Sequence, residues 1–157
     1  MIKLKELRVL VFFMSLFVFV LGACAPMKLN VIPEKASITP DLLKNPIKFS
    51  AAGFRPNEVV SIELVVPKGV PMKGLGAGEN RVGVGVATAD DKGNFEVAMA
   101  AISTLNNLFQ VGWTSAMTPD FKQANPLPAG RYDIVATGVE SNKVAKGVIE
   151  IVPPPGK

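Results

Sequence analysis

Few side chains in this 157-residue chain are of the types that do chemistry. There is no histidine, so the chain can form neither a Ser-His-Asp triad nor a Cys-His nucleophile, and no imidazole can bind a metal. The single cysteine, Cys24, excludes an internal disulfide, a CxxC redox pair and a zinc site built on thiolates. We therefore predict a protein that is not an enzyme and that carries no cofactor and no metal ion.

Two pairs of carboxylates are close enough in sequence to be considered for acid-base chemistry. Glu58 and Glu63 lie five positions apart along a predicted strand, so their side chains should point to opposite faces. Asp90 and Asp91 lie in a segment typical of a turn, and we interpret them as turn residues. A calcium site made of Asp90, Asp91 and Asn94 is the alternative, although it supplies fewer ligands than an EF-hand loop.

Glycines are concentrated between residues 68 and 85. Their spacing matches neither GxGxxG nor GxxxxGK[ST] in front of a helix, so they do not predict a nucleotide site. We expect residues 68–80 to form a mobile loop. In the strand predicted at 82–86, three valines alternate with Gly83 and Gly85, which should leave a flat strip for a neighbouring backbone or aromatic ring to pack on.

Residues 100–123 form a long, aromatic-rich insertion between the strands predicted around Phe95 and Tyr132. Apolar residues recur in it every four positions, at Leu105, Phe109, Trp113, Met117 and Phe121. On a helix this spacing gives a drifting apolar stripe; Gly112, Thr114 and Ser115 weaken that helix, and Pro119 should end it. The stripe has three interpretations: extra core over an open end of the domain, an exposed surface for a partner, or a second membrane contact. We take these five residues as the candidate partner-binding or ligand-binding site.

The first 23 residues predict a targeting signal. Residues 1–8 carry three basic residues and one acidic residue, and residues 9–21 are apolar apart from Ser15. This apolar stretch suits the hydrophobic region of a signal peptide and falls short of the roughly 20 residues needed to span a bilayer. An uncleaved membrane anchor is the alternative.

The segment Leu21-Gly22-Ala23-Cys24 follows directly. It resembles the lipobox of bacterial lipoproteins. The resemblance implies cleavage before Cys24, a diacylglycerol thioether on its sulfur and acylation of the new amino group, so that lipid on Cys24 holds the protein at the membrane. Several acyl chains anchor firmly because each buried methylene contributes about 0.8 kcal/mol. Since residue 25 is alanine and not aspartate, the resemblance also implies the outer membrane if the host is Gram-negative.

Cleavage would leave a nearly neutral chain. Residues 24–157 comprise 134 residues with 14 Lys and Arg and 12 Asp and Glu. They contain no basic run interleaved with aromatic residues, so we expect no nucleic-acid partner. We divide them into a lipidated cysteine with its tether at 24–36, a single domain at 37–152 and a Pro-rich tail at 153–157.

The domain consists of short β-forming runs separated by turn residues. These runs occupy residues 47–51, 59–66, 82–86, 95–97, 132–136 and 144–152. Gly, Pro, Asn and Asp separate them, as in the turn at 90–94. About seven such strands without regularly spaced helices predict an all-β fold, namely an antiparallel β-sandwich.

Four segments carry a further pattern: Ala52–Val60, Thr88–Asp90 with Gly93–Phe95, Pro126–Tyr132 and Ala136–Gly138. Together they resemble bacterial envelope domains of immunoglobulin-like type. The resemblance covers residues 37–152 and implies an immunoglobulin-like sandwich with one long insertion. Tyr132 then occupies the position of a tyrosine corner, whose hydroxyl bonds to the backbone. Asn57 stands where that pattern has glycine, and asparagine tolerates the left-handed conformation.

These observations favour a non-enzymatic binding or scaffolding module, lipid-anchored in the bacterial cell envelope, with a protein or glycan as its partner. The alternative is a small-ligand or glycan-binding lipoprotein in which Trp113 stacks on a sugar ring. A hydrolase or transferase is a third hypothesis, and it requires the fold to gather at least two carboxylates in one cleft. The candidates for such a cluster are Glu58, Asp90, Asp120, Asp133 and Glu140.

Overall fold

The computed structural model describes residues 27–156. The predicted signal peptide at 1–23, the predicted lipidation site Cys24 and Lys157 lie outside the described residues. The structure is 42% strand and 12% helix, which confirms the all-β class. Within residues 27–156, no helix has the length and apolar character needed to cross a membrane.

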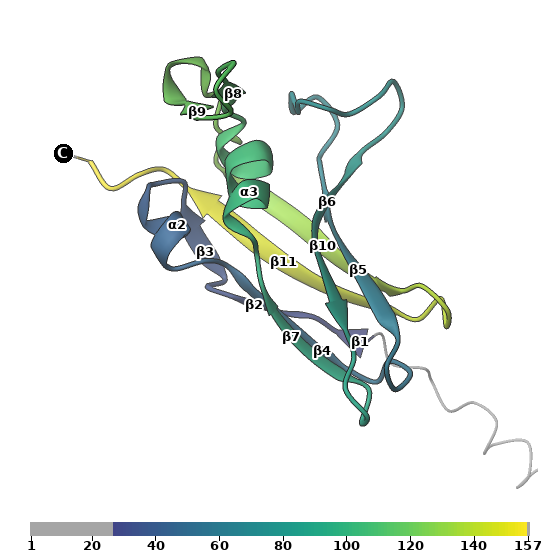
Figure 1. The fold of residues 1–157 in the computed structure, drawn as a ribbon. Helices are drawn as coiled ribbons and strands as arrows, with labels where there is room; N and C mark the ends of the chain where they lie inside the picture. Colours follow the sequence, from purple (N-terminus) through teal and green to yellow (C-terminus); the bar gives the residue numbers. More distant parts are fainter. Residues whose placement is uncertain (1–26, 157) are drawn as a thin grey trace, which may run out of the picture.

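The elements follow one another along the chain as shown in Figure 1. They are β1 (Met27–Lys28), β2 (Asn30–Ile32), β3 (Lys35–Ser37), α2 (Asp41–Lys44), β4 (Lys48–Ala52), β5 (Val59–Val65), β6 (Arg81–Thr88), β7 (Asn94–Ala98), α3 (Ala101–Ser103), the π-helix η1 (Thr104–Phe109), β8 (Gly112–Trp113), β9 (Pro119–Asp120), the 3-10 helix η2 (Phe121–Gln123), β10 (Gly130–Gly138) and β11 (Val144–Val152). Strands are present in all six ranges in which the sequence predicts them. Residues 153–156 follow β11 without a strand or helix.

The strands form two main sheets. The larger has the order β1-β11-β10-β5-β6, with β3 also paired to β11, and the smaller has the order β2-β4-β7. The small sheet is antiparallel, whereas in the large sheet β1 and β3 both run parallel to β11. The large sheet is therefore mixed, which differs from the wholly antiparallel arrangement expected from the sequence.

The inner faces of the two sheets supply the core. On β5, Val60, Ile62 and Leu64 are buried while the residues between them are partly exposed, as two-residue alternation requires. The large buried side chains come from both sheets and include Phe49, Phe95, Tyr132, Ile134 and Ile149. Burial of these apolar faces against each other is the main force that holds the sheets together.

The segment expected to be a tether at 24–36 is instead folded from Met27 onward. β1 pairs with β11, the chain then crosses to the small sheet as β2, and it returns to β11 as β3. The first crossing brings the Leu29 carbonyl so close to Gly147 that a Cβ there would lie 2.5 Å from its oxygen. The tether expectation is wrong over these residues because the strands are too short to show a periodic pattern.

The flat strip expected at Gly83 and Gly85 is absent. The register between β5 and β6 shifts between Ile62 and Glu63, which places a β-bulge in β6. The bulge leaves Val84 buried but turns Val86 outward, with 64% of its surface exposed. Gly83 has open space beside its Cα, so no aromatic ring or backbone packs there.

The two ends of the molecule differ. At the end where β1 begins, here called the β1 end, the turns at 53–58, 89–93 and 139–143 meet, and Lys143 Nζ donates to the Gly53 carbonyl at 2.5 Å. At the opposite end, here called the insertion end, lie α3, η1, β8 and β9 (Figure 1). β10 connects the two ends, and its nine residues span about 26 Å at a rise near 3.3 Å per residue.

Candidate functional site

The insertion does not form the single helix that its spacing predicts. α3 and η1 make one short helical segment that ends at Gln110, whose φ of 48° is left-handed. The chain then forms the β8–β9 hairpin, in which Gly112 pairs with Asp120, and the turn of η2. The helix therefore ends well before Pro119, because the left-handed residue and Gly112 interrupt it first.

This backbone separates the five candidate residues. Phe109 is buried, Leu105 is partly buried, and Trp113, Met117 and Phe121 are exposed. Phe109 and Phe121 still meet edge to face, with ring centroids 5.8 Å apart. The structure thus brings only this pair into aromatic contact.

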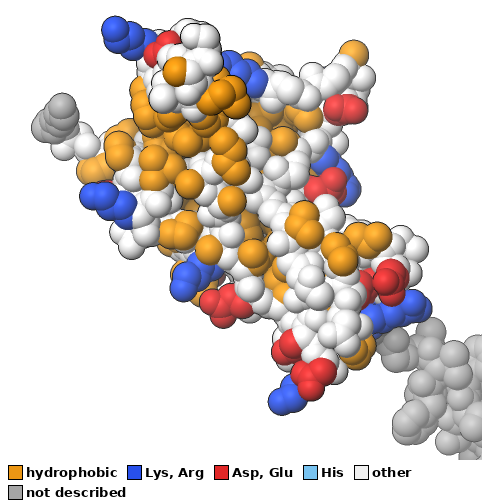
Figure 2. Space-filling model, in the orientation of Figure 1, with side chains coloured by type: hydrophobic (Ala, Val, Ile, Leu, Met, Phe, Trp, Pro, Cys, Tyr) orange, Lys and Arg blue, Asp and Glu red, His pale blue; other side chains and the backbone are white. Residues whose placement is uncertain are grey.

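Part of the insertion covers the core. Leu108 is 1% exposed and belongs to the main hydrophobic cluster, and its carbonyl accepts the Leu127 N–H at 2.8 Å. The remainder leaves a group of apolar side chains in solvent: Ile102, Trp113, Met117 and Phe121. Figure 2 shows hydrophobic side chains gathered over α3 and the β8–β9 hairpin. The insertion is therefore both extra core and exposed apolar surface.

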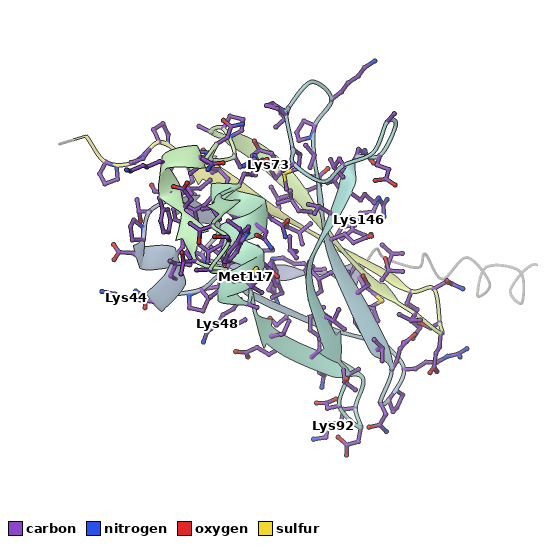
Figure 3. All side chains as sticks on the ribbon, turned by 45° about the horizontal axis from the view of Figure 1, so that its top comes forward. Lys44, Lys48, Lys73, Lys92, Met117 and Lys146 are labelled. Atoms are coloured by element: carbon purple, nitrogen blue, oxygen red, sulfur yellow. The ribbon has the colours of Figure 1, made fainter. Side chains whose placement is uncertain are left out.

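A buried glutamine holds the insertion to the loop between β5 and β6. Gln110 is 1% exposed; its Oε1 accepts the Lys73 N–H at 2.7 Å and its Nε2 donates to the Pro71 carbonyl at 3.3 Å. The Lys73 ammonium (Lys73 is labelled in Figure 3) in turn donates to the Gln110 carbonyl at 2.7 Å. These bonds fix part of the loop that the sequence predicts to be mobile, and no local pattern marks Gln110 as buried.

Two further polar contacts position the insertion. Asn107 Nδ2 donates to the Gly83 carbonyl on the outer edge of β6 at 2.9 Å. Trp113 Nε1 donates to Asn106 Oδ1 at 2.9 Å, which fixes the indole ring while 36% of the residue stays exposed. Because its ring is held and one part of it remains accessible, Trp113 is suited to serve as an anchor for a partner.

Glu58 occupies a site that the sequence does not reveal. It is fully buried, and its carboxylate accepts four hydrogen bonds: from the N–H groups of Arg55, Glu140 and Ser141 at 2.9, 3.0 and 2.6 Å, and from Ser141 Oγ at 2.9 Å. Burial raises the pKa of this carboxyl, but the four hydrogen bonds outweigh it and lower the pKa from 4.5 to about 2. The ionised Glu58 thus links the turn at 53–58 to the β10–β11 turn by hydrogen bonds.

Asp90 has the turn role expected of it. Its Oδ1 accepts the N–H groups of Lys92 and Asn94 at 2.9 and 2.8 Å, and the bond from Asn94 is the main cause that lowers the pKa of this carboxyl. Gly93 in the same turn has a φ of 78°, in the left-handed region that favours glycine. Among residues 27–156, no three His, Cys, Asp or Glu side chains are grouped so as to hold a metal ion.

Four prominent grooves on the surface of residues 27–156 do not include the exposed aromatic residues. The largest of the four, about 880 Å³, lies beside β2, β3 and α2 and is lined by residues such as Ile32, Leu42 and Pro155. Trp113 lines neither this groove nor three further ones, and none of the four brings together two of the five carboxylates named as a possible cluster. A sugar that stacks on Trp113 would therefore bind outside these four grooves.

No family model matches the sequence, and no curated protein matches it either. Solved structures with a similar course of the chain include the crystal structure of a beta-D-glucoside glucohydrolase from Trichoderma reesei, at 12% sequence identity and a TM-score of 0.47. The match covers 82% of this chain but only 18% of the glucohydrolase chain. A likeness this distant carries no argument about function.

Proposed function

We propose that the protein is a lipid-anchored component of the bacterial cell envelope, attached through Cys24, whose domain is a non-enzymatic module for binding or scaffolding. One observation carries this proposal. β1 begins only three residues after Cys24, at one end of the molecule, whereas Trp113, Met117 and Phe121 are exposed at the other. A lipid anchor on Cys24 would therefore present the exposed apolar side chains away from the membrane.

We further propose that the domain is an immunoglobulin-like β-sandwich of seven main strands. They are β2, β4 and β7 in one sheet and β5, β6, β10 and β11 in the other. The chain changes sheet between β4 and β5 and again between β6 and β7, as in the Greek-key connections of this fold. Tyr132, near the start of β10, donates its hydroxyl to the Pro128 carbonyl at 2.7 Å, which is the bond expected of a tyrosine corner.

A protein is the partner that this surface fits best. Large apolar side chains that stay in solvent within one segment often mark an interaction site. Trp is prominent among the residues that dominate binding energy. The length of β10, about 26 Å, separates this surface from the point where the chain would join its lipid. That separation argues against the third interpretation, a second contact with the same membrane.

The test is photocrosslinking in cells from positions 113, 117 and 121, with the full chain at its native membrane. We expect one discrete protein adduct from these positions and none from two controls, buried Phe109 and Lys92, which lies on a turn at the β1 end. Adducts from position 92 alone would contradict the proposal. A saturable change in Trp113 fluorescence with soluble sugars would instead favour the glycan-binding alternative.

The anchor has its own test. Replacing Cys24 with alanine removes the only thiol in the chain, so we expect loss of lipid labelling and accumulation of the uncleaved precursor. The matched variant Ser15→Ala keeps the thiol and should be lipidated and cleaved normally. Efficient processing of Cys24→Ala would contradict lipoprotein anchoring.

A further inference from the structure

A second exposed apolar surface lies at the opposite end of the molecule, on the outer face of the large sheet. It consists of four valines, here called the valine patch: Val59, Val86, Val139 and Val144. Cross-strand pairing places them on the same face, in two neighbouring rows. Val144 is opposite Thr137 on β10, Thr137 is opposite Ser61 on β5, and Ser61 is opposite Val86 on β6. Val139 joins the next row, where its N–H donates to the Val59 carbonyl at 2.9 Å.

The patch is uncharged and has a sharp boundary. The outward residues between the valines, Ser61 and Thr137, carry no charge. The next row toward the insertion end contains Lys146 and Glu63, which flank Val135. The row after that contains Asp133 and Arg81. The uncharged surface therefore occupies only the part of this face nearest the β1 end, and charged residues occupy the rest.

The position of the patch matters because the chain before β1 is short. Only Ala25 and Pro26 separate Cys24 from Met27. Three residues of fully extended chain reach about 10 Å, so lipid on Cys24 would keep the β1 end at the bilayer surface. Met27 pairs with Ala145, which directly follows Val144. The patch starts at the strand beside β1 and extends across three inter-strand spacings of about 4.8 Å each.

We propose that the valine patch rests on the lipid bilayer and that it acts as a second membrane contact beside the acyl chains of Cys24. This inference rests on the lipidation proposed above. Exposed apolar side chains with basic residues beside them favour contact with the membrane interface, above all where anionic lipids are present. Lys28 and Lys146 pair in the row beside the patch, and Lys143 directly precedes Val144; these exposed ammonium groups suit anionic headgroups, whereas the exposed Glu140 beside Val139 does not. Lys146 extends from the large sheet, on the side opposite Lys48 of the small sheet (Figure 3).

The charged rows determine the orientation of the domain on the bilayer. They exclude the rest of the outer face from the apolar region of the bilayer, so the domain contacts lipid with its strands inclined and not lying flat. The insertion end stays in water in this arrangement. The patch is thus distinct from the partner surface around Trp113, and both can be engaged at once.

The test uses the full lipidated chain in vesicles of phosphatidylcholine and phosphatidylglycerol that contain a doxyl-labelled lipid. Lipidation blocks the single native cysteine, so a new cysteine can be labelled alone with an environment-sensitive NBD dye. We compare Val86→Cys with the control Met117→Cys, which is 77% exposed at the insertion end. We expect several-fold stronger doxyl quenching of the label at 86 than of the label at 117.

The outcomes separate this inference from the anchor itself. Protein that floats with the vesicles but shows no quenching at 86 would overturn the patch and leave lipidation intact. Protein that does not float would overturn both. The label at 86 could instead be shielded from water without being quenched by the doxyl lipid, with a crosslinked dimer present. This result would mean that a second copy of the chain covers the patch, and it would also overturn the lipid contact.

A charge placed in the patch gives an independent measurement. With the dye at Val144→Cys, the added substitution Val86→Asp should reduce doxyl quenching several-fold. The matched variant Ile32→Asp puts the same charge on an exposed apolar residue of the small sheet and should leave quenching unchanged. Equal quenching in both variants would contradict a lipid contact at the patch.

Discussion

Replacing Tyr132 with phenylalanine tests the corner that joins the insertion to β10. The substitution removes only a hydroxyl from a side chain that is 1% exposed and leaves the ring packing in place. The lost bond is the 2.7 Å contact with the Pro128 carbonyl. A typical intramolecular hydrogen bond contributes about 1 kcal/mol, and an acceptor left unsatisfied in a buried place costs more. Pro128 is itself exposed, so water can reach its carbonyl, and we expect a loss of about 1 kcal/mol.

The assay is urea unfolding followed by the fluorescence of Trp113, the only tryptophan, and by far-ultraviolet circular dichroism. We expect a lower midpoint with an unchanged denaturant slope, and a melting temperature lower by roughly 4 °C. Pro128→Ala is the control, because it keeps the carbonyl that accepts the bond. An unchanged midpoint in Tyr132→Phe would refute the corner.

The same residue offers a spectroscopic check, because the chain contains one tyrosine. Burial raises the pKa of Tyr132 above its usual value of 10, so the folded protein keeps a proton that the unfolded chain releases near pH 10. The stability linked to this group is present below that pH and falls as the pH rises beyond it. Tyrosinate absorbance in the folded protein should therefore appear above pH 10, and titration at the ordinary value would show that the hydroxyl is accessible.

Two further predictions concern the turns of the β1 end. Because the pKa of Glu58 is lowered to about 2, its contribution to stability is present above about pH 4.5 and is lost as the pH falls toward 2. The urea midpoint of the native chain should therefore fall more steeply across this window than that of Glu58→Gln. Parallel curves of midpoint against pH would contradict the role of Glu58 as an ionised link between the two turns. Gly93→Ala should cost about 1–3 kcal/mol, because it combines a left-handed φ with a collision between the new Cβ and the Phe54 carbonyl oxygen. Gly74→Ala is its control, since it has the same φ region with open space around it and should cost only about 1 kcal/mol in calorimetric unfolding; equal losses would show that the close approach at Phe54 is unimportant.

Long strands with one buried face could be predicted from the sequence. The alternation through Val60, Ile62 and Leu64 identifies β5 and its inward side correctly. When one face of a sheet is buried, apolar residues must recur at every second position of the strand. The turn at Asp90 and Gly93 is equally local, because its chemistry depends on residues within five positions of one another.

The errors arise where distant contacts decide the local structure. β2 and β3 have three residues each and owe their conformation to pairing with β4 and β11, so they show no period of their own. The spacing of four in the insertion suggests a helix, but that helix ends at Gln110, which bonds to Lys73 in a loop 37 positions earlier. Tertiary contacts of this kind override a periodic signal that is correct for an isolated segment.

The parallel pairing of β1 with β11 has a mechanical consequence. The chain enters β1 at Met27 and runs toward the insertion end alongside β11. Tension applied before Met27 therefore acts along the strand, and the hydrogen bonds to β11, continued by the Leu29 N–H on the Lys146 carbonyl, must be sheared together. A strand that could be peeled away one bond at a time would give way at a lower force. With the proposed lipid anchor on Cys24, a partner that pulls on the insertion end would load the pairing of β1 with β11 in shear.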